Sequence, residues 1–121
     1  VPLFSERVYR AMNENSVDNL FVKKVTLTDR IQKKSCMYIM AVPPCIDAVD
    51  YSLSETECIK DGYNPLYDVR RLVIDEEKTG NYQIFKLSHV TDSSIYINES
   101  LKKCLDRIRP DGMEIVPYDI L

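Results

Sequence analysis

The sequence predicts an α+β domain in which two helices, at about residues 5–15 and 98–109, pack on a mostly antiparallel β-sheet. Two observations lead to this fold class. Each end of the chain carries a capped segment with apolar residues at helical spacing, and between the two lie short apolar segments separated by polar turns. Because 121 residues are enough for one domain with a real core, we expect a single domain over residues 1–121.

The two helices are predicted from their caps and their apolar faces. Ser5 and Asn98 are good N-cap residues, and each is followed by a glutamate in the first turn, where a negative charge suits the helix dipole. The second helix should end at the Pro-Asp-Gly run of residues 110–112. The positions expected to face the core are Phe4, Val8, Ala11 and Met12 in the first helix and Leu101, Cys104, Leu105 and Ile108 in the second.

Six strands are expected, at residues 20–27, 37–42, 57–60, 67–74, 84–87 and 113–116. Residues 37–42 belong to the longest apolar run and are followed by two prolines, which cannot donate ladder hydrogen bonds, so we expect a buried strand that ends there. In the first strand, Leu20 and Val22 should point inward, with Val25 and Leu27 as further candidates. The Lys-Lys pair at 23–24 predicts a bulge or a sheet edge.

The two ends of the chain resemble each other at an offset of 93 residues. Residues 4–8 align with residues 97–101, and residues 20–22 align with residues 113–115. Each unit then consists of a cap, a helix with one apolar stripe, and a strand. An internal repeat and the general likeness of short helix–strand units both account for this pattern.

Charge and length exclude several classes of function. A net charge of −3 argues against general affinity for nucleic acid, and no apolar run approaches the roughly 18 residues of a membrane helix. Because the chain begins with Val1, we expect that a natural N-terminal segment is missing, which would also hide a signal peptide. We expect a cytoplasmic protein without nucleic-acid or membrane partners, and the sequence leaves the oligomeric state open.

The four cysteines form no Cys-x-x-Cys pair, and His89 is the single histidine. We therefore expect neither a structural zinc site nor a cofactor. Cys36, Cys45 and Cys104 lie on apolar segments, where a free cysteine behaves as a small hydrophobe, so we predict that they are buried and reduced.

Residues 43–63 concentrate the negative charge of the chain. Five carboxylates, at Asp47, Asp50, Glu55, Glu57 and Asp61, stand against one lysine in this segment, which gives it a net charge of −4. Such a run is either a solvated loop or a partner-facing loop that complements a basic surface. Five tyrosines bracket the segment, and tyrosine is favoured at protein interfaces, although most of the five should be core-edge residues. They are Tyr38, Tyr51, Tyr63, Tyr67 and Tyr82.

The sequence offers little catalytic chemistry. Cys45 or Cys58 with His89 and Asp92 would supply the residue types of a cysteine hydrolase, but no helix N-terminus follows either cysteine to activate it. His89 is better interpreted as a surface residue at a strand end. The first two carboxylates of the acidic segment are three residues apart, a spacing that does not place both on one face of a strand. We therefore expect no catalytic residues.

Four segments in a fixed order resemble a known family. They are residues 3–7 (Leu-Phe-Ser-Glu-Arg), 38–55, 84–87 (Ile-Phe-Lys-Leu), and 95–102 together with 112–115. This set is similar to the bacterial immunity proteins of polymorphic toxin systems, specifically immunity class eleven, a former domain of unknown function. Members carry more chain before the opening helix. The family sets no catalytic residues, and Asp50, Ser54 and Glu55 match its recurring positions, which are equally compatible with turn capping.

The resemblance implies a non-enzymatic inhibitor that binds a cognate protein toxin. The resemblance and the acidic segment together predict a partner-binding set, namely Asp47, Asp50, Ser54, Glu55, Glu57 and Asp61. Two other hypotheses stay open. A small-ligand-binding or regulatory α+β module predicts a closed apolar pocket of roughly a few hundred Å³, and a hydrolase would use Cys45 or Cys58.

Overall fold

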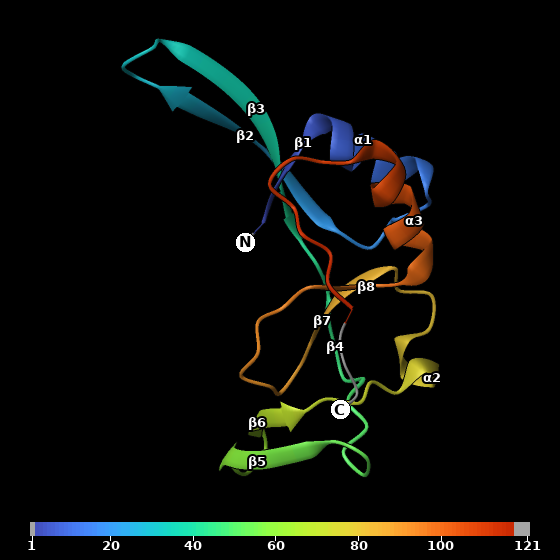
Figure 1. Cartoon of the computed structure of the whole chain (residues 1–121). Helices are drawn as coiled ribbons and strands as arrows, with labels where there is room; N and C mark the ends of the chain where they lie inside the picture. The colour runs from blue at the N-terminus through green and yellow to red at the C-terminus, as the bar shows by residue number, and fades with distance from the viewer. Residues whose placement is uncertain (1, 118–121) are drawn as a thin grey trace.

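The computed structural model, which describes residues 2–117, confirms the α+β class but divides the expected sheet into three (Figure 1). The first sheet has the order β1 (Leu3–Ser5), β3 (Lys34–Val42), β2 (Phe21–Asp29). The second has the order β4 (Cys45–Ile46), β7 (Ile84–Leu87), β8 (Tyr96–Ile97), and the third is the hairpin of β5 (Glu55–Lys60) and β6 (Leu66–Arg71). The helices are α1 (Glu6–Glu14), α2 (Glu76–Thr79) and α3 (Glu99–Ile108). Of the strand pairs in these sheets, only β4–β7 is parallel.

Both predicted long helices form with their predicted caps. Ser5 Oγ accepts a hydrogen bond from the Val8 amide at 3.2 Å, and Asn98 Oδ1 accepts one from the Leu101 amide at 2.9 Å. These bonds satisfy amide groups that have no partner inside the helix. The cap residues therefore determine where α1 and α3 begin.

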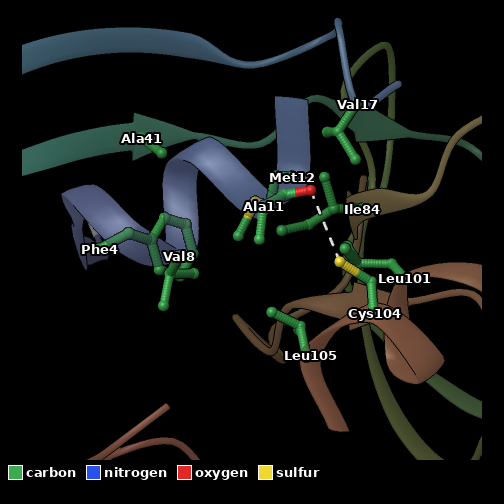
Figure 2. Close-up of a cluster of buried hydrophobic side chains, with 10 residues drawn as sticks. All are labelled: Phe4, Val8, Ala11, Met12, Val17, Ala41, Ile84, Leu101, Cys104 and Leu105. Atoms are coloured by element: carbon green, nitrogen blue, oxygen red, sulfur yellow. Dashed lines mark hydrogen bonds between the residues drawn. The ribbon is translucent and has the colours of Figure 1, made fainter. Parts of the chain in front are cut away.

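The apolar faces of α1 and α3 meet in the larger core, shown in Figure 2. Met12 is 1% exposed and Leu101 is fully buried. The Cys104 thiol donates a hydrogen bond to the Ala11 carbonyl oxygen at 3.5 Å (Figure 2), so the two helices touch at positions that the 93-residue offset aligns. The buried members of this core are Phe4, Val8, Ala11, Met12, Val17, Ala41, Ile84, Leu101, Cys104 and Leu105.

The likeness between the two ends of the chain extends only to strand, cap and helix. β1 leads through Ser5 into α1, and β8 leads through Asn98 into α3. The segments that follow the two helices differ, because residues 20–22 lead into β2 whereas residues 113–116 form no strand. The predicted last strand is therefore wrong. Met113 and Ile115 still pack on the core, because alternating apolar residues can bury their side chains without a hydrogen-bonded neighbour strand.

The β2–β3 ribbon is longer and more exposed than predicted. The expected buried strand at 37–42 is buried only at Ile39 and Ala41, while Met37 is 49% exposed. Val22 and Leu27, expected to point inward, are 43% and 47% exposed. Met37 is exposed because the far part of the ribbon extends past the helices into solvent (Figure 1), and Leu27 lies on the opposite face of the ribbon from the buried Ala41. The prediction that the lysine pair at 23–24 marks a sheet edge is confirmed, because β2 is an outer strand.

A second core lies under the other half of the molecule. Its buried members are Ala48, Val49, Ile74, Phe85 and Leu87. A β-bridge joins Val49 to Ile74, and the Phe85 ring stacks on Tyr96 at 6.0 Å between centroids. The short helix α2 was not predicted from the sequence, although Asp75 caps it and two glutamates fill its first turn.

Of the three cysteines predicted to be buried, two are exposed. Cys104 is buried in the larger core, but Cys36 and Cys45 are exposed, as is Cys58. Cys36 lies opposite Leu27 on the protruding ribbon, where no element covers that pair among the described residues. Cys45 follows the two prolines at the start of β4, and all four thiols are free.

Candidate partner-binding surface

The acidic segment folds into the loop before β5 and into the β5–β6 hairpin, at the opposite end of the molecule from the β2–β3 ribbon (Figure 1). Glu55 and Glu57 lie on β5, which forms where a strand was expected at residues 57–60 but begins two residues earlier. Asp47 follows β4 and Asp61 lies at the hairpin turn. All four of these carboxylate residues are exposed.

Asp50 organises the turn that leads into β5. Its Oδ1 accepts hydrogen bonds from the Ser52 amide at 3.0 Å, the Ser52 hydroxyl at 2.6 Å and the Leu53 amide at 3.2 Å. The hydrogen bond from the Ser52 side chain is the largest cause that lowers the pKa of Asp50 below its ordinary value of 3.8. These contacts make Asp50 a turn-capping residue, one of the two roles that the sequence left open.

Ser54 ties the same turn to the chain beyond β6. Its hydroxyl accepts a hydrogen bond from the Val73 amide at 2.8 Å and donates one to the Val73 carbonyl oxygen at 3.2 Å. A side chain thus replaces the backbone partner that a strand would supply at this position. Ser54 is half-buried, and its two hydrogen bonds join the start of β5 to the chain that follows β6.

Strand pairing changes the charge of the acidic segment. β6 brings Arg70 within 3.1 Å of Glu57 and places Arg71 opposite Glu55. Over residues 55–71, four carboxylates stand against three cationic side chains, so the hairpin has a net charge of −1. Neither arginine was predicted to belong to this surface, although both lie within the strand expected at residues 67–74. An exposed pair such as Glu57–Arg70 stabilises the fold by only about 0–1 kcal/mol.

Two tyrosines near the hairpin differ in environment. Tyr51 packs against Tyr67 with ring centroids 5.0 Å apart, and its partial burial, followed by the nearby charge of Asp47, raises its pKa above 10.0. Tyr63 is fully exposed at the hairpin turn. Of the five tyrosines that bracket the acidic segment, Tyr63 therefore offers a partner the most accessible ring.

The residues of the hypothetical cysteine hydrolase do not hydrogen-bond to one another. The Nδ1 atom of His89 lies 3.2 Å from the Pro65 carbonyl oxygen, and within residues 2–117 no hydrogen bond joins His89 to Cys45 or Cys58. Asp92 accepts hydrogen bonds from Ser94 and Tyr96, and the Ser94 side chain is the largest cause that lowers the pKa of Asp92. In the same part of the chain, no cluster of three or more His, Cys, Asp or Glu side chains is arranged to hold a metal ion.

A groove of about 1120 Å³ lies between β7, β8, α3 and residues 113–117. Its walls include Ile97 and Leu105, with Glu99 and Lys102 among the charged residues. It is larger and more open than the closed pocket expected for a ligand-binding module. The predicted partner-binding carboxylates lie elsewhere, and Glu55, Glu57 and Arg70 line a shallow, open depression.

None of the described helices has the length and apolar character needed to cross a membrane.

Comparison with known proteins gives one result that bears on identity. The family model described as "Immunity protein family (Imm11)" matches residues 1–119. Searches of curated proteins and of solved structures found no match. Because the family match spans nearly the entire chain, this protein belongs to the Imm11 immunity protein family.

Proposed function

We propose that this protein is a non-enzymatic immunity protein that binds a cognate bacterial toxin in the cytoplasm and neutralises it. Membership of the immunity protein family over residues 1–119 is the observation that carries the proposal. The geometry supports it, because the β5–β6 hairpin stands away from α1 and α3 and a partner reaches it without disturbing the larger core (Figure 1).

Within the predicted partner-binding set, the contacts divide the residues into two roles. The exposed carboxylates of Asp47, Glu55, Glu57 and Asp61 are the proposed points of contact, and a basic toxin surface would complement them. Asp50 and Ser54 act through the turn that they hold. Tyr63 adds a fully exposed aromatic side chain beside Asp61, of the kind that often dominates binding energy at an interface.

Co-expression with the toxin encoded beside this chain's gene tests the proposal. Cells should survive the toxin only when the folded chain is present, and the two proteins should co-purify as a stable complex. The proposal fails if the toxin stays lethal in cells that contain the folded chain and no complex can be isolated.

A titration separates binding from catalysis. An inhibitor that acts by covering its target protects in proportion to its amount, so toxin activity should reach zero near one equivalent of this chain. Complete protection at a small fraction of one equivalent would instead reveal turnover, and the protein would then be an enzyme.

Binding of a small apolar ligand is a second candidate function, because the groove beside α3 is lined mainly by apolar side chains, as ligand sites are. Titration with the fluorophore 1-anilinonaphthalene-8-sulfonate checks it. If the groove binds the fluorophore, the fluorescence should saturate. Ile95→Asp, in the groove, should then abolish it, and Leu27→Asp, on the β2–β3 ribbon, should leave it unchanged. Fluorescence that responds equally to both variants would count against it.

A further inference from the structure

The β2–β3 ribbon has two different faces. The strands pair without interruption from Phe21–Val42 to Asp29–Lys34, and directly opposite residues of an antiparallel pair lie on the same face. Residues along each strand alternate between faces. One face, which we name the outer face, is defined by Leu3 of β1 with Phe21, Val25, Leu27, Tyr38 and Met40.

The opposite face belongs to the larger core. Ile39 and Ala41 point to this side and are 2% and 0% exposed, and Phe4, which pairs with Ile39, is 8% exposed. Figure 2 shows Ala41 and Phe4 beside α1. The sheet is therefore covered on one side by the helices.

The outer face has no such cover among the described residues. Phe21 is 82% exposed, Leu27 47% and Leu3 43%. An antiparallel sheet that packs on a core with one face normally presents polar side chains on the other. Contiguous exposed apolar side chains rimmed by polar residues mark interaction sites in soluble proteins.

The charge of the ribbon indicates what could cover this face. Over residues 21–42, five cationic side chains stand against Asp29, for a net charge of +4. Most of these cations lie at or near the tip, while Lys23 interrupts the outer face opposite Met40. A second copy of this chain would bring two positively charged ribbons together, and these would repel each other. A partner with acidic side chains would be attracted. Lys23 and Lys24 also protect the free edge of β2 against pairing with another strand, which leaves the face as the contact.

We propose that the outer face of the β2–β3 ribbon is a docking surface for the toxin, and that it takes an apolar toxin surface bordered by carboxylates. This inference rests on the proposed function and adds a second contact region to it, with chemistry opposite to that of the β5–β6 hairpin. The apolar side chains hold the complex together and the cations near the ribbon tip orient it.

Adjacent substitutions on opposite faces give the sharpest test. Leu27→Asp places a carboxylate on the outer face, and Thr26→Asp places the same charge one residue earlier on the other face. In kinetic binding measurements with the purified toxin, Leu27→Asp should weaken the complex at least about 30-fold, mainly through faster dissociation. Thr26→Asp should change the affinity by less than about threefold.

Phe21→Ser provides a second variant. Because Phe21 is 82% exposed, its removal leaves no cavity in the fold, and the complex should again dissociate faster. The circular dichroism spectrum and melting temperature of each variant establish that it is folded before its binding is compared.

The possible outcomes separate the two proposals. If wild-type protein binds the toxin and both outer-face variants bind equally well, the inference is wrong and the proposed function stands. If sedimentation shows a dimer that Leu27→Asp converts to a monomer while toxin binding is unchanged, a second copy covers this face and the inference is again wrong. If the wild type binds no toxin, the proposed function fails and the docking surface fails with it.

Discussion

The β2–β3 ribbon and the β5–β6 hairpin are both two-stranded and antiparallel, and they stand at opposite ends of the molecule with opposite surface chemistry (Figure 1). The ribbon keeps one register over nine residue pairs and carries a net charge of +4 with an apolar outer face. The hairpin has two register shifts and a net charge of −1. The partner strand therefore decides what a hairpin presents, because β6 adds arginines to an acidic strand while β3 adds apolar residues to a basic one.

The two regions are also held by different interactions. The inner part of the ribbon rests on the larger core through Ala41, and its buried Ile39 pairs with Phe4, another member of that core. The hairpin is attached through the second core and through the hydrogen bonds of Asp50 and Ser54. The ribbon is attached by buried apolar side chains, whereas the attachment of the hairpin includes polar contacts near the surface. Substitutions in the two regions should therefore lower the free energy of unfolding by different amounts.

Truncation in either core should have the largest effect. Leu101→Ala in the larger core should lower the free energy of unfolding by about 2–5 kcal/mol, and Phe85→Ala in the second by about 3–5 kcal/mol. If the two ends form one cooperative domain, each variant shifts a single transition in urea, with the same midpoint by circular dichroism and by tyrosine fluorescence. Ile59→Ala, at a position 57% exposed, is the control and should stay within about 0.5 kcal/mol of wild type. Two separate transitions would show that the ends are independent.

Removal of the Ser54 hydroxyl should have a smaller effect, confined to the hairpin end. Ser54→Ala leaves the Val73 amide and carbonyl without their side-chain partner and should lower the free energy of unfolding by about 1–3 kcal/mol. Ser52→Ala, which removes a hydrogen bond at an exposed position, should lower it by less than about 1 kcal/mol. Equal losses in chemical denaturation would mean that Ser54 does not anchor the hairpin.

Charge reversal on the hairpin should change the kinetics of toxin binding in a different way from the outer-face variants. The triple variant Glu55→Lys, Glu57→Lys, Asp61→Lys should slow association about tenfold at low salt and leave dissociation nearly unchanged, because exposed charges act mainly on the encounter rate. Asp50 is left out of the variant because it caps a turn. Association and dissociation rates at two salt concentrations check this prediction. An unchanged association rate at low salt would leave the β2–β3 ribbon as the principal contact.

The pH dependence of stability should show the smallest effect, through Asp50. Its pKa in the folded protein is lowered below 3.8, so its contribution to stability is present above that value and is lost as the pH falls through the lowered pKa. Asp50→Asn retains a side-chain oxygen for the turn but removes the titrating group. The melting temperature of this variant should therefore fall less than that of wild type between about pH 5 and pH 2. Asp92→Asn is the comparison, since the pKa of Asp92 is lowered by the same kind of contact with Ser94. Identical acid profiles for wild type and Asp50→Asn would exclude the turn as a source of the pH dependence.

Much of the local structure could be predicted because its causes are local. Ser5 and Asn98 bond to amides three residues away, and the strand at Ile84–Leu87 forms with the expected bounds. The helix at Glu76–Thr79 also had a local signal in the cap of Asp75 and the acidic first turn. For the partner-binding set, the sequence located the exposed carboxylates but could not separate Asp50 and Ser54 from them, because the Ser54 partner Val73 is 19 residues away.

Local sequence was enough to predict the fold class, the starts of the two long helices, their apolar faces and the break at Pro43–Pro44. Each depends on residues within a few positions of one another. Three features became visible only in the folded chain: the exposure of Cys36, Cys45, Val22 and Leu27, the lack of a neighbouring strand at residues 113–116, and the arginines on β6 that offset the acidic segment. Burial and net surface charge are set by which segments meet in space, and an apolar strand looks the same in sequence whether a helix covers it or solvent does.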